Sequence, residues 1–338
     1  MSSKPGPPAT LGGIPSTIPD IPVSAVLLAL FVAGGATHMT LFVRNRRRNH
    51  RFIFSFVLFM FTVTRAAALS LRIAWARSPR NPDLALAATL FTAAGVLILF
   101  IINLVLAERT VRALHPAILL GRARRLLRWG FRALLASVVA VLIMVVVCTV
   151  HSNLTTDAAA KRKERDVMLF AGVYMAVVAL LPAVAVGLAW ALPRRRGDRP
   201  SNPPDGEVFL LGRKGDRMGP KVALLGSASL LLTLGAGFRT GVNFATKPAG
   251  QEQWYHSKPA LYCFSFAIEL VVVYSYAIFR FDRMFYVPDS GNNSKEVGHG
   301  SESQEVGMGQ SFEKGRSGDS GRELVDRPIY DDAGRYEV

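Results

Sequence analysis

Seven mostly apolar stretches, each near the length of a membrane span, constrain this chain more than any other feature. A helix needs about 20 apolar residues to cross the hydrocarbon core of a bilayer, where backbone groups must be satisfied internally. Half of the 338 residues are hydrophobic. The sequence therefore predicts an all-α polytopic membrane protein, a bundle of seven transmembrane helices. The predicted spans are 22–43, 52–75, 84–107, 133–150, 167–192, 222–245 and 261–280.

The basic residues between the spans predict the orientation. The loops after spans one, three and five hold 20 Lys and Arg, whereas the N-terminal segment and the other three loops hold 9. Positive residues favour the cytoplasmic side, so the N-terminus is predicted outside and the C-terminus in the cytoplasm. The basic run 161–165 departs from this pattern, but the sequon at Asn153 on the same loop predicts glycosylation and so favours the outer side.

Composition at the two ends predicts three regions. Residues 1–21 are rich in Pro and Gly and predict a disordered extracellular tail, followed by the membrane domain over 22–283. Residues 284–338 hold 11 acidic and 6 basic side chains with many Ser and Gly, and they predict a disordered cytoplasmic tail. A cleaved signal over 23–36 is the alternative for the first span, but five Arg in 44–51 favour a retained helix.

Several function classes lack support in the sequence. The net charge of +16 lies in short runs between spans, which favours membrane orientation over nucleic-acid binding. The chain has no phosphate-binding loop, no nucleophile elbow and no paired His or Cys motif, so we expect no ATPase, enzyme, metal or cofactor. Cys148 and Cys263 lie near the outer ends of their spans, and both free thiols and a disulfide remain open.

Four ionisable residues within the spans are the candidate functional site. Arg65, Arg72, Arg239 and Glu269 fall at overlapping depths in the predicted outer half of the membrane. Charged groups are costly there and should face the protein interior or water. One interpretation is that Glu269 pairs with Arg65 or Arg239 and locks helices together, while Arg72 reaches the outer interface.

The other interpretation is a binding pocket. Three positive charges around one negative charge leave a net positive site that suits an anionic head group or carboxylate. Three further polar residues lie on roughly the same face of the seventh span as Glu269. They complete the predicted ligand-binding set, which is Arg65, Arg72, Arg239, Glu269, Tyr262, Ser265 and Tyr276.

Other polar residues have structural interpretations. Asn103 in the third span predicts an interhelical hydrogen bond. Glu108 and Arg109 at the end of that span are similar to the acidic-Arg pair of seven-helix receptors, although charged pairs also commonly cap helices. The motif Gly237-x-x-x-Gly241 predicts close helix packing beside Arg239.

A scattered set of residues over about 22–288 carries a family resemblance. The chain resembles fungal seven-span membrane proteins of unknown function, which are similar to the fungal lipid-translocating exporter (aminocholesterol-resistance) family. The resemblance implies movement of sphingoid bases or other amphiphiles, and it implies no catalytic residue. The residues that carry it are Arg65, Leu71 to Trp75, Asn103-Leu104, Glu108-Arg109, His115-Pro116, Phe238-Arg239, Trp254, Ser257-Lys258, Tyr262, Glu269 and Arg280 to Asp282.

The leading prediction is an integral membrane protein that binds and moves or senses an amphiphilic, lipid-like ligand without an ATPase of its own. A seven-helix receptor coupled to a cytoplasmic partner is the alternative, and a membrane-embedded enzyme is the third. The expected partners are membrane lipids and a small amphiphile, and the expected location is the plasma membrane, with endomembranes as the alternative.

Overall fold

A computed structural model describes most of the chain. The described residues are 11–48, 52–115, 122–155, 157–192, 218–245, 247 and 253–285. All regular structure in these ranges is helical, and seven helices are long and apolar enough to cross a membrane. The predicted fold class and span count are therefore confirmed: the chain is a multi-pass membrane protein. The orientation of its termini stays a prediction.

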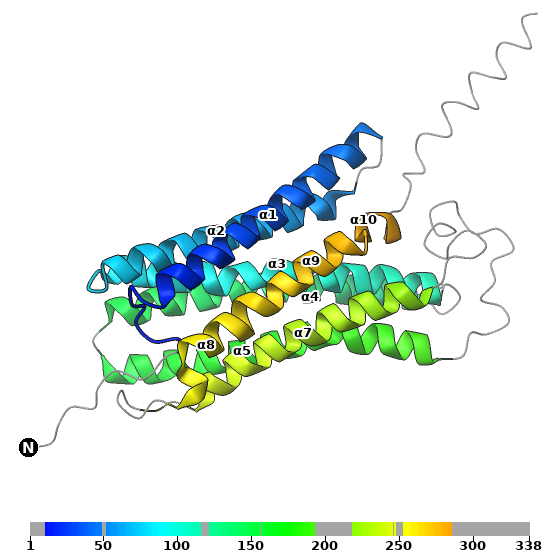
Figure 1. Cartoon of the computed structure of the whole chain (residues 1–338). Helices are drawn as coiled ribbons and strands as arrows, with labels where there is room; N and C mark the ends of the chain where they lie inside the picture. The colour runs from blue at the N-terminus through cyan, green and yellow to red at the C-terminus, as the bar shows by residue number, and fades with distance from the viewer. Residues whose placement is uncertain are drawn as a thin grey trace, which may run out of the picture. The chain divides into compact units, whose positions relative to one another are not determined.

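Six of the spans are continuous helices, and the seventh has three segments (Figure 1). The seventh begins with α8 (Lys258–Leu261), passes through the π-helical segment η4 (Tyr262–Ala267) and continues as α9 (Ile268–Ile278). The short helices η3 (Trp254–His256) and α10 (Phe281–Met284) flank it. The six continuous helices are α1 (Asp20–Arg47), α2 (Ile53–Arg77), α3 (Pro82–Leu114), α4 (Arg122–Leu154), α5 (Ala158–Ala191) and α7 (Met218–Phe244).

Three helices extend well beyond the predicted spans. Helices α3, α4 and α5 have 33, 33 and 34 residues. The basic residues of 161–165, predicted on a loop, lie instead in the first turns of α5. The side chain of Asp157 accepts a hydrogen bond from the backbone N–H of Ala159 and caps this helix, so helical structure continues past the apolar stretch.

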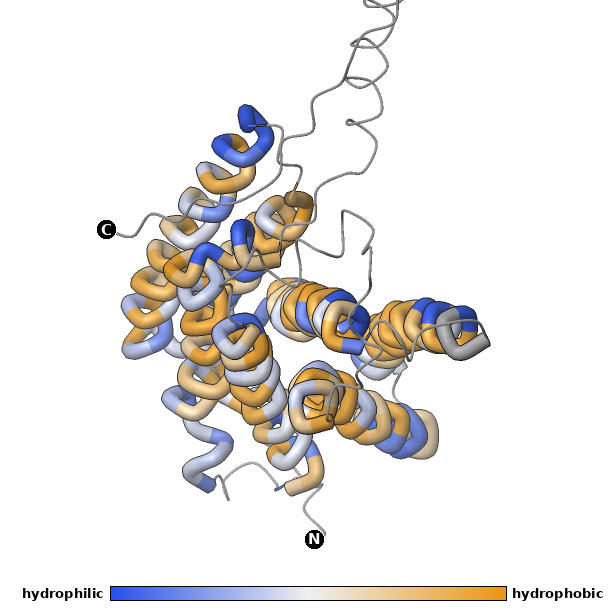
Figure 2. Tube along the Cα trace, turned by 90° about the vertical axis from the view of Figure 1, so that its right-hand side faces the viewer, coloured by the Kyte–Doolittle hydropathy of each residue, from blue (hydrophilic) through white to orange (hydrophobic). Residues whose placement is uncertain are grey.

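Helix α3 lies at the centre of the bundle. It packs against α2, α4, α5 and α7, while α9 packs against α1 and α7. Of the apolar window in α3, 56% of the residues are buried, against 6% in α4, so α4 is peripheral. Figure 2 shows apolar residues along the lengths of the helices, and many of these side chains are exposed on the bundle, as expected of surfaces that face lipid tails.

The N-terminal segment contacts the chain just before the last span. Helix α1 begins at Asp20, two residues before the predicted first span, and residues 11–19 precede it as turns and irregular structure. The backbone N–H of Gly12, a residue with a φ of +76°, donates to the carbonyl of His256 at 2.9 Å. The first half of the predicted tail, residues 1–10, lies outside the described residues.

The end of the last span folds back on the bundle. Arg280 adopts a left-handed conformation with a φ of +49° and starts α10, whose Phe281 is fully buried. Burial raises the pKa of the Asp282 carboxyl, but hydrogen bonds from Arg280 and Asn45 outweigh burial and hold that pKa below its usual value. The predicted C-terminal tail beyond residue 285 lies outside the described residues.

Candidate functional site

The first of two buried ion clusters joins α2, α7 and α9 in the middle of the bundle. We call Arg65, Arg239 and Glu269 the central cluster. The Nε of Arg65 lies 2.5 Å from Oε2 of Glu269, and its Nη2 donates to Oε1 at 2.5 Å. Only the Nη2 contact has hydrogen-bond geometry, and the two contacts together place the guanidinium charge against both carboxylate oxygens. Arg65 therefore neutralises both oxygens of Glu269.

The surroundings of Arg65 exclude water. Its side chain is 0% exposed, its Nη1 donates to the carbonyl of Thr92 at 2.7 Å, and its guanidinium lies over the rings of Phe61 and Phe266. A Cβ on Gly95 would lie 3.0 Å from the Arg65 guanidinium, so a glycine on α3 makes room for the charge. The pair thus fastens α2 to α9 with α3 packed against it.

Arg239 occupies a different position in the same cluster. Its Nη1 lies 4.0 Å from Oε1 of Glu269, at the limit of an ion pair, and its side chain is 20% exposed. The sequence left Arg65 and Arg239 as equal candidates for pairing with Glu269. The structure brings both close but gives the hydrogen-bonded contact to Arg65.

A π-helical segment just before Glu269 shapes this part of the bundle. Helix α7 approaches it so closely that a Cβ on Gly235 would lie 2.7 Å from the carbonyl oxygen of Phe264. The predicted close packing at Gly237 and Gly241 was wrong, because no described atom lies within 4 Å of a Cβ at either position. The seventh span instead approaches α7 on the face that carries Gly235. π-helical turns such as η4 are common at functional sites.

The second cluster, which we call the terminal cluster, lies where α1 and α8 begin and comprises Asp20, Arg72, Lys258 and Tyr262. Asp20 accepts from Arg72 at 3.0 Å, from the Tyr262 hydroxyl at 2.6 Å, and lies 2.7 Å from Nζ of Lys258. Arg72 also contacts the carbonyl of Gly12 at 3.2 Å and the Tyr262 oxygen at 3.1 Å.

This cluster corrects one interpretation of the sequence. Arg72 was expected to extend to the outer interface, but it is buried and paired with Asp20. Sequence reasoning missed Asp20 because it fell just before the predicted first span and was assigned to the tail. An acidic residue in the first turn of a helix was the available signal.

The two remaining residues of the predicted ligand-binding set, Ser265 and Tyr276, belong to neither cluster. Ser265 is buried, and its hydroxyl has no hydrogen-bond partner within the described ranges. The Tyr276 hydroxyl donates to Asn103, whose amide donates to Ser229 at 3.3 Å. Asn103 thus links α3, α7 and α9, and Tyr276 belongs to this structural link instead of to the central cluster.

Residues at the helix ends have local contacts. Glu108 pairs with Arg112 one turn later, while the guanidinium of Arg109 lies 4.8 Å from the Phe54 ring centre. Asn153, the predicted glycosylation site, lies in the last turn of α4 and donates to the carbonyl of Thr149. Cys148 and Cys263 are both free.

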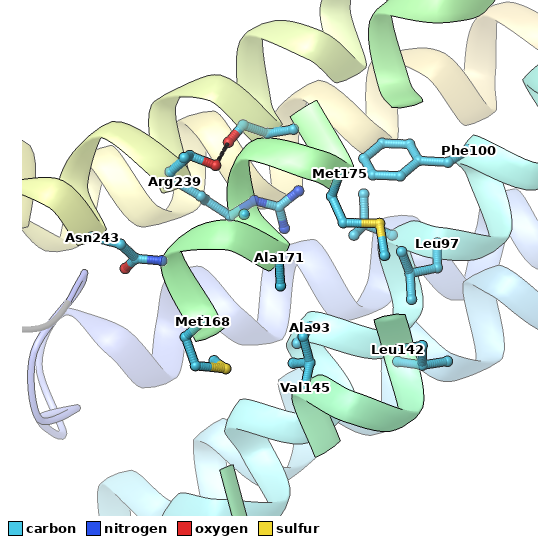
Figure 3. A pocket seen from close by; sticks show the side chains of 14 residues that line it. Ala93, Leu97, Phe100, Leu142, Val145, Met168, Ala171, Met175, Arg239 and Asn243 are labelled. Carbon is cyan, nitrogen blue, oxygen red and sulfur yellow. Dashed lines mark hydrogen bonds between the residues drawn. The ribbon is translucent and has the colours of Figure 1, made fainter. Parts of the chain in front are cut away.

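A cavity of about 150 Å³ lies among residues of α3, α4, α5 and α7 (Figure 3). Most of its wall is apolar, and Arg239, Thr240 and Asn243 from α7 form a polar side. In Figure 3 the Arg239 side chain points into the space lined by Ala171 and Met175. The sequence identified Arg239 but not the cavity, because its wall comes from four separate spans. In the described ranges, no group of three or more His, Cys, Asp or Glu could hold a metal ion.

The fold and these clusters define a seven-helix membrane protein with a buried ion pair beside an apolar cavity. Residues 217–286 match a family described as a protein of unknown function (DUF3112). The matched segment includes α7 and the seventh span, and with them Arg239, Lys258, Tyr262 and Glu269. No curated protein and no solved structure matches the chain.

Proposed function

We propose that this membrane protein binds an amphiphilic, lipid-like molecule in the cavity among α3, α4, α5 and α7, and that it moves or senses this molecule. The observation that carries the proposal is the cavity lining, which combines an apolar wall with a polar side at Arg239. Ligand sites are typically apolar pockets with a few converging polar groups. Within a bilayer, an amphiphile supplies both an apolar and a polar part.

Two further considerations support an amphiphile. A charged side chain inside a membrane span marks a functional site by default, and Arg239 retains partial exposure beside the cavity. The resemblance to fungal lipid-translocating exporters favours an amphiphilic ligand without specifying the charge of its head group, and the plasma membrane is the proposed location. The proposal assigns no catalytic step to the protein, and it includes no nucleotide hydrolysis because the sequence has no phosphate-binding loop.

The test is reconstitution of the purified full chain in liposomes with fluorescent amphiphiles in one leaflet. We expect the protein to bind the amphiphile, and a transporter also speeds its redistribution between leaflets. Ala171→Phe should reduce binding because Ala171 is buried and lines the cavity. Val147→Phe is the matched control, since Val147 is 59% exposed on the bundle surface.

The outcomes separate the alternatives. Absence of amphiphile binding by folded wild-type protein refutes the proposal. Binding without redistribution favours sensing, and ligand-stimulated recruitment of a G protein would favour the receptor. Equal binding by Ala171→Phe and wild type would show that the ligand lies elsewhere in the bundle.

A further inference from the structure

The central cluster carries one excess positive charge. It contains two guanidinium groups and one carboxylate, and Arg65 engages both oxygens of that carboxylate at 2.5 Å. Arg239 approaches only Oε1 of Glu269, at 4.0 Å. The excess charge therefore resides on Arg239.

This charge faces the cavity. The Arg65 side chain is fully buried against Thr92, Phe61 and Phe266, whereas Arg239 lines the cavity and is 20% exposed. The terminal cluster also holds two cations and one carboxylate, but there both cations reach Asp20, at 3.0 and 2.7 Å. Among the cations of these two clusters, Arg239 thus combines two properties. It lacks a close carboxylate partner within its cluster, and it lines the cavity.

We infer that Arg239 binds the head group of the amphiphile and that this head group carries a single negative charge, as a carboxylate does. The inference rests on the proposed function and specifies its ligand class. A carboxylate matches the planar donors of a guanidinium. One negative charge balances the cluster, whereas a second would lie unbalanced near Glu269. A cationic head group is repelled by Arg239 and finds Glu269 already engaged by Arg65.

The cavity volume limits the apolar part of the ligand. A cavity near 150 Å³ accommodates an apolar group of about the size of benzene. It holds the part of a single hydrocarbon chain next to the head group, and the rest of a longer chain extends between helices into the bilayer. A carboxylate on one chain therefore fits better than a phospholipid with two chains at the head group.

The test compares head groups on one chain length. Dodecanoate, dodecylamine and dodecylphosphocholine are measured by equilibrium binding to the full chain in nanodiscs at mildly alkaline pH, with empty nanodiscs subtracted. We expect wild type to bind dodecanoate about tenfold or more tightly than the other two, a difference of about 1.4 kcal/mol or more. Arg239→Gln should abolish this preference and Arg239→Lys should retain part of it, in variants whose thermal unfolding confirms that they are folded.

Acetate and benzoate distinguish a lipid from a free acid. If either binds as tightly as dodecanoate, the site recognises a small anion and the lipid head group is wrong. Equal binding of the three dodecyl compounds by wild type overturns the inference while the proposed function stands. If none of the three binds, the proposed function fails together with the inference. The comparison on wild type keeps the inference testable even if Arg239→Gln does not fold.

Discussion

The central and terminal clusters contain the same charges in different arrangements. Each holds two cations and one carboxylate, and each joins segments distant in the sequence. In the terminal cluster both cations and a tyrosine hydroxyl converge on Asp20. In the central cluster Arg65 pairs with the Glu269 carboxylate, whereas Arg239 faces the cavity. Geometry, and not charge composition, therefore separates an ion pair that fastens helices from one that leaves a charge available for a ligand.

The largest expected effect is that of Glu269→Gln, which leaves Arg65 buried without a counter-charge. Removing one partner of a buried ion pair costs about 3–5 kcal/mol. We expect a large fall in the thermal unfolding midpoint of the detergent-solubilised protein. Adding Arg65→Gln should recover more of this loss than adding Arg239→Gln, because Arg65 makes the close contact. An unchanged midpoint in Glu269→Gln would show that the pair of Arg65 and Glu269 does not stabilise the bundle.

The second prediction concerns Asp20→Asn in the terminal cluster. This change weakens the contacts with Arg72 and Lys258, and hydrogen bonds to charged groups contribute about 1.5–3 kcal/mol. The Lys258 side chain is 25% exposed, whereas the side chains of Arg65 and Glu269 are 0% and 2% exposed. Salt should screen the pair of Lys258 with Asp20 more than the pair of Arg65 with Glu269. The difference in unfolding midpoint between wild type and Asp20→Asn should therefore be smaller at high salt than at low salt. A gap that does not change with salt would contradict the partial exposure of this cluster.

The third prediction tests the close packing beside the central cluster. Gly235→Ala should destabilise by about 1–3 kcal/mol, because its Cβ would lie 2.7 Å from the carbonyl oxygen of Phe264. Gly237→Ala on the same helix is the control, since its Cβ would meet no described atom within 4 Å. The readout is again thermal unfolding. Equal midpoints for the two variants would indicate that the π-helical segment is not packed tightly against α7.

The smallest effect is expected for Tyr262→Phe. The change removes a hydroxyl that donates to Asp20 and contacts Arg72, a loss of about 0.5–1.5 kcal/mol. Tyr274→Phe provides the comparison, because the half-buried Tyr274 donates an exposed hydrogen bond to the uncharged carbonyl of Leu30 at 3.0 Å. Thermal unfolding should rank Tyr262→Phe below Tyr274→Phe in stability. The reverse order would mean that the tyrosine adds little to the terminal cluster.

Hydropathy alone determined the number and approximate position of the spans. Consecutive apolar residues indicate a span regardless of its neighbours, so this property is local. The cost of charge in a bilayer likewise identified Arg65, Arg72, Arg239 and Glu269 before any contact was known. Hydropathy underestimated the lengths of α3, α4 and α5. These helices continue beyond the apolar stretches into polar surroundings, where caps such as Asp157 stabilise them.

Only the tertiary structure decided which charges meet and which residues enclose space. Glu269 and Arg65 lie 204 positions apart, and their contact depends on how α2 and α9 are rotated about their axes. The same rotations paired Arg72 with Asp20, linked Tyr276 to Asn103 and placed close packing at Gly235. The cavity at Arg239 needs walls from four helices. Hydropathy is a property of neighbouring residues, whereas pairing and enclosure depend on the relative tilt and rotation of whole helices.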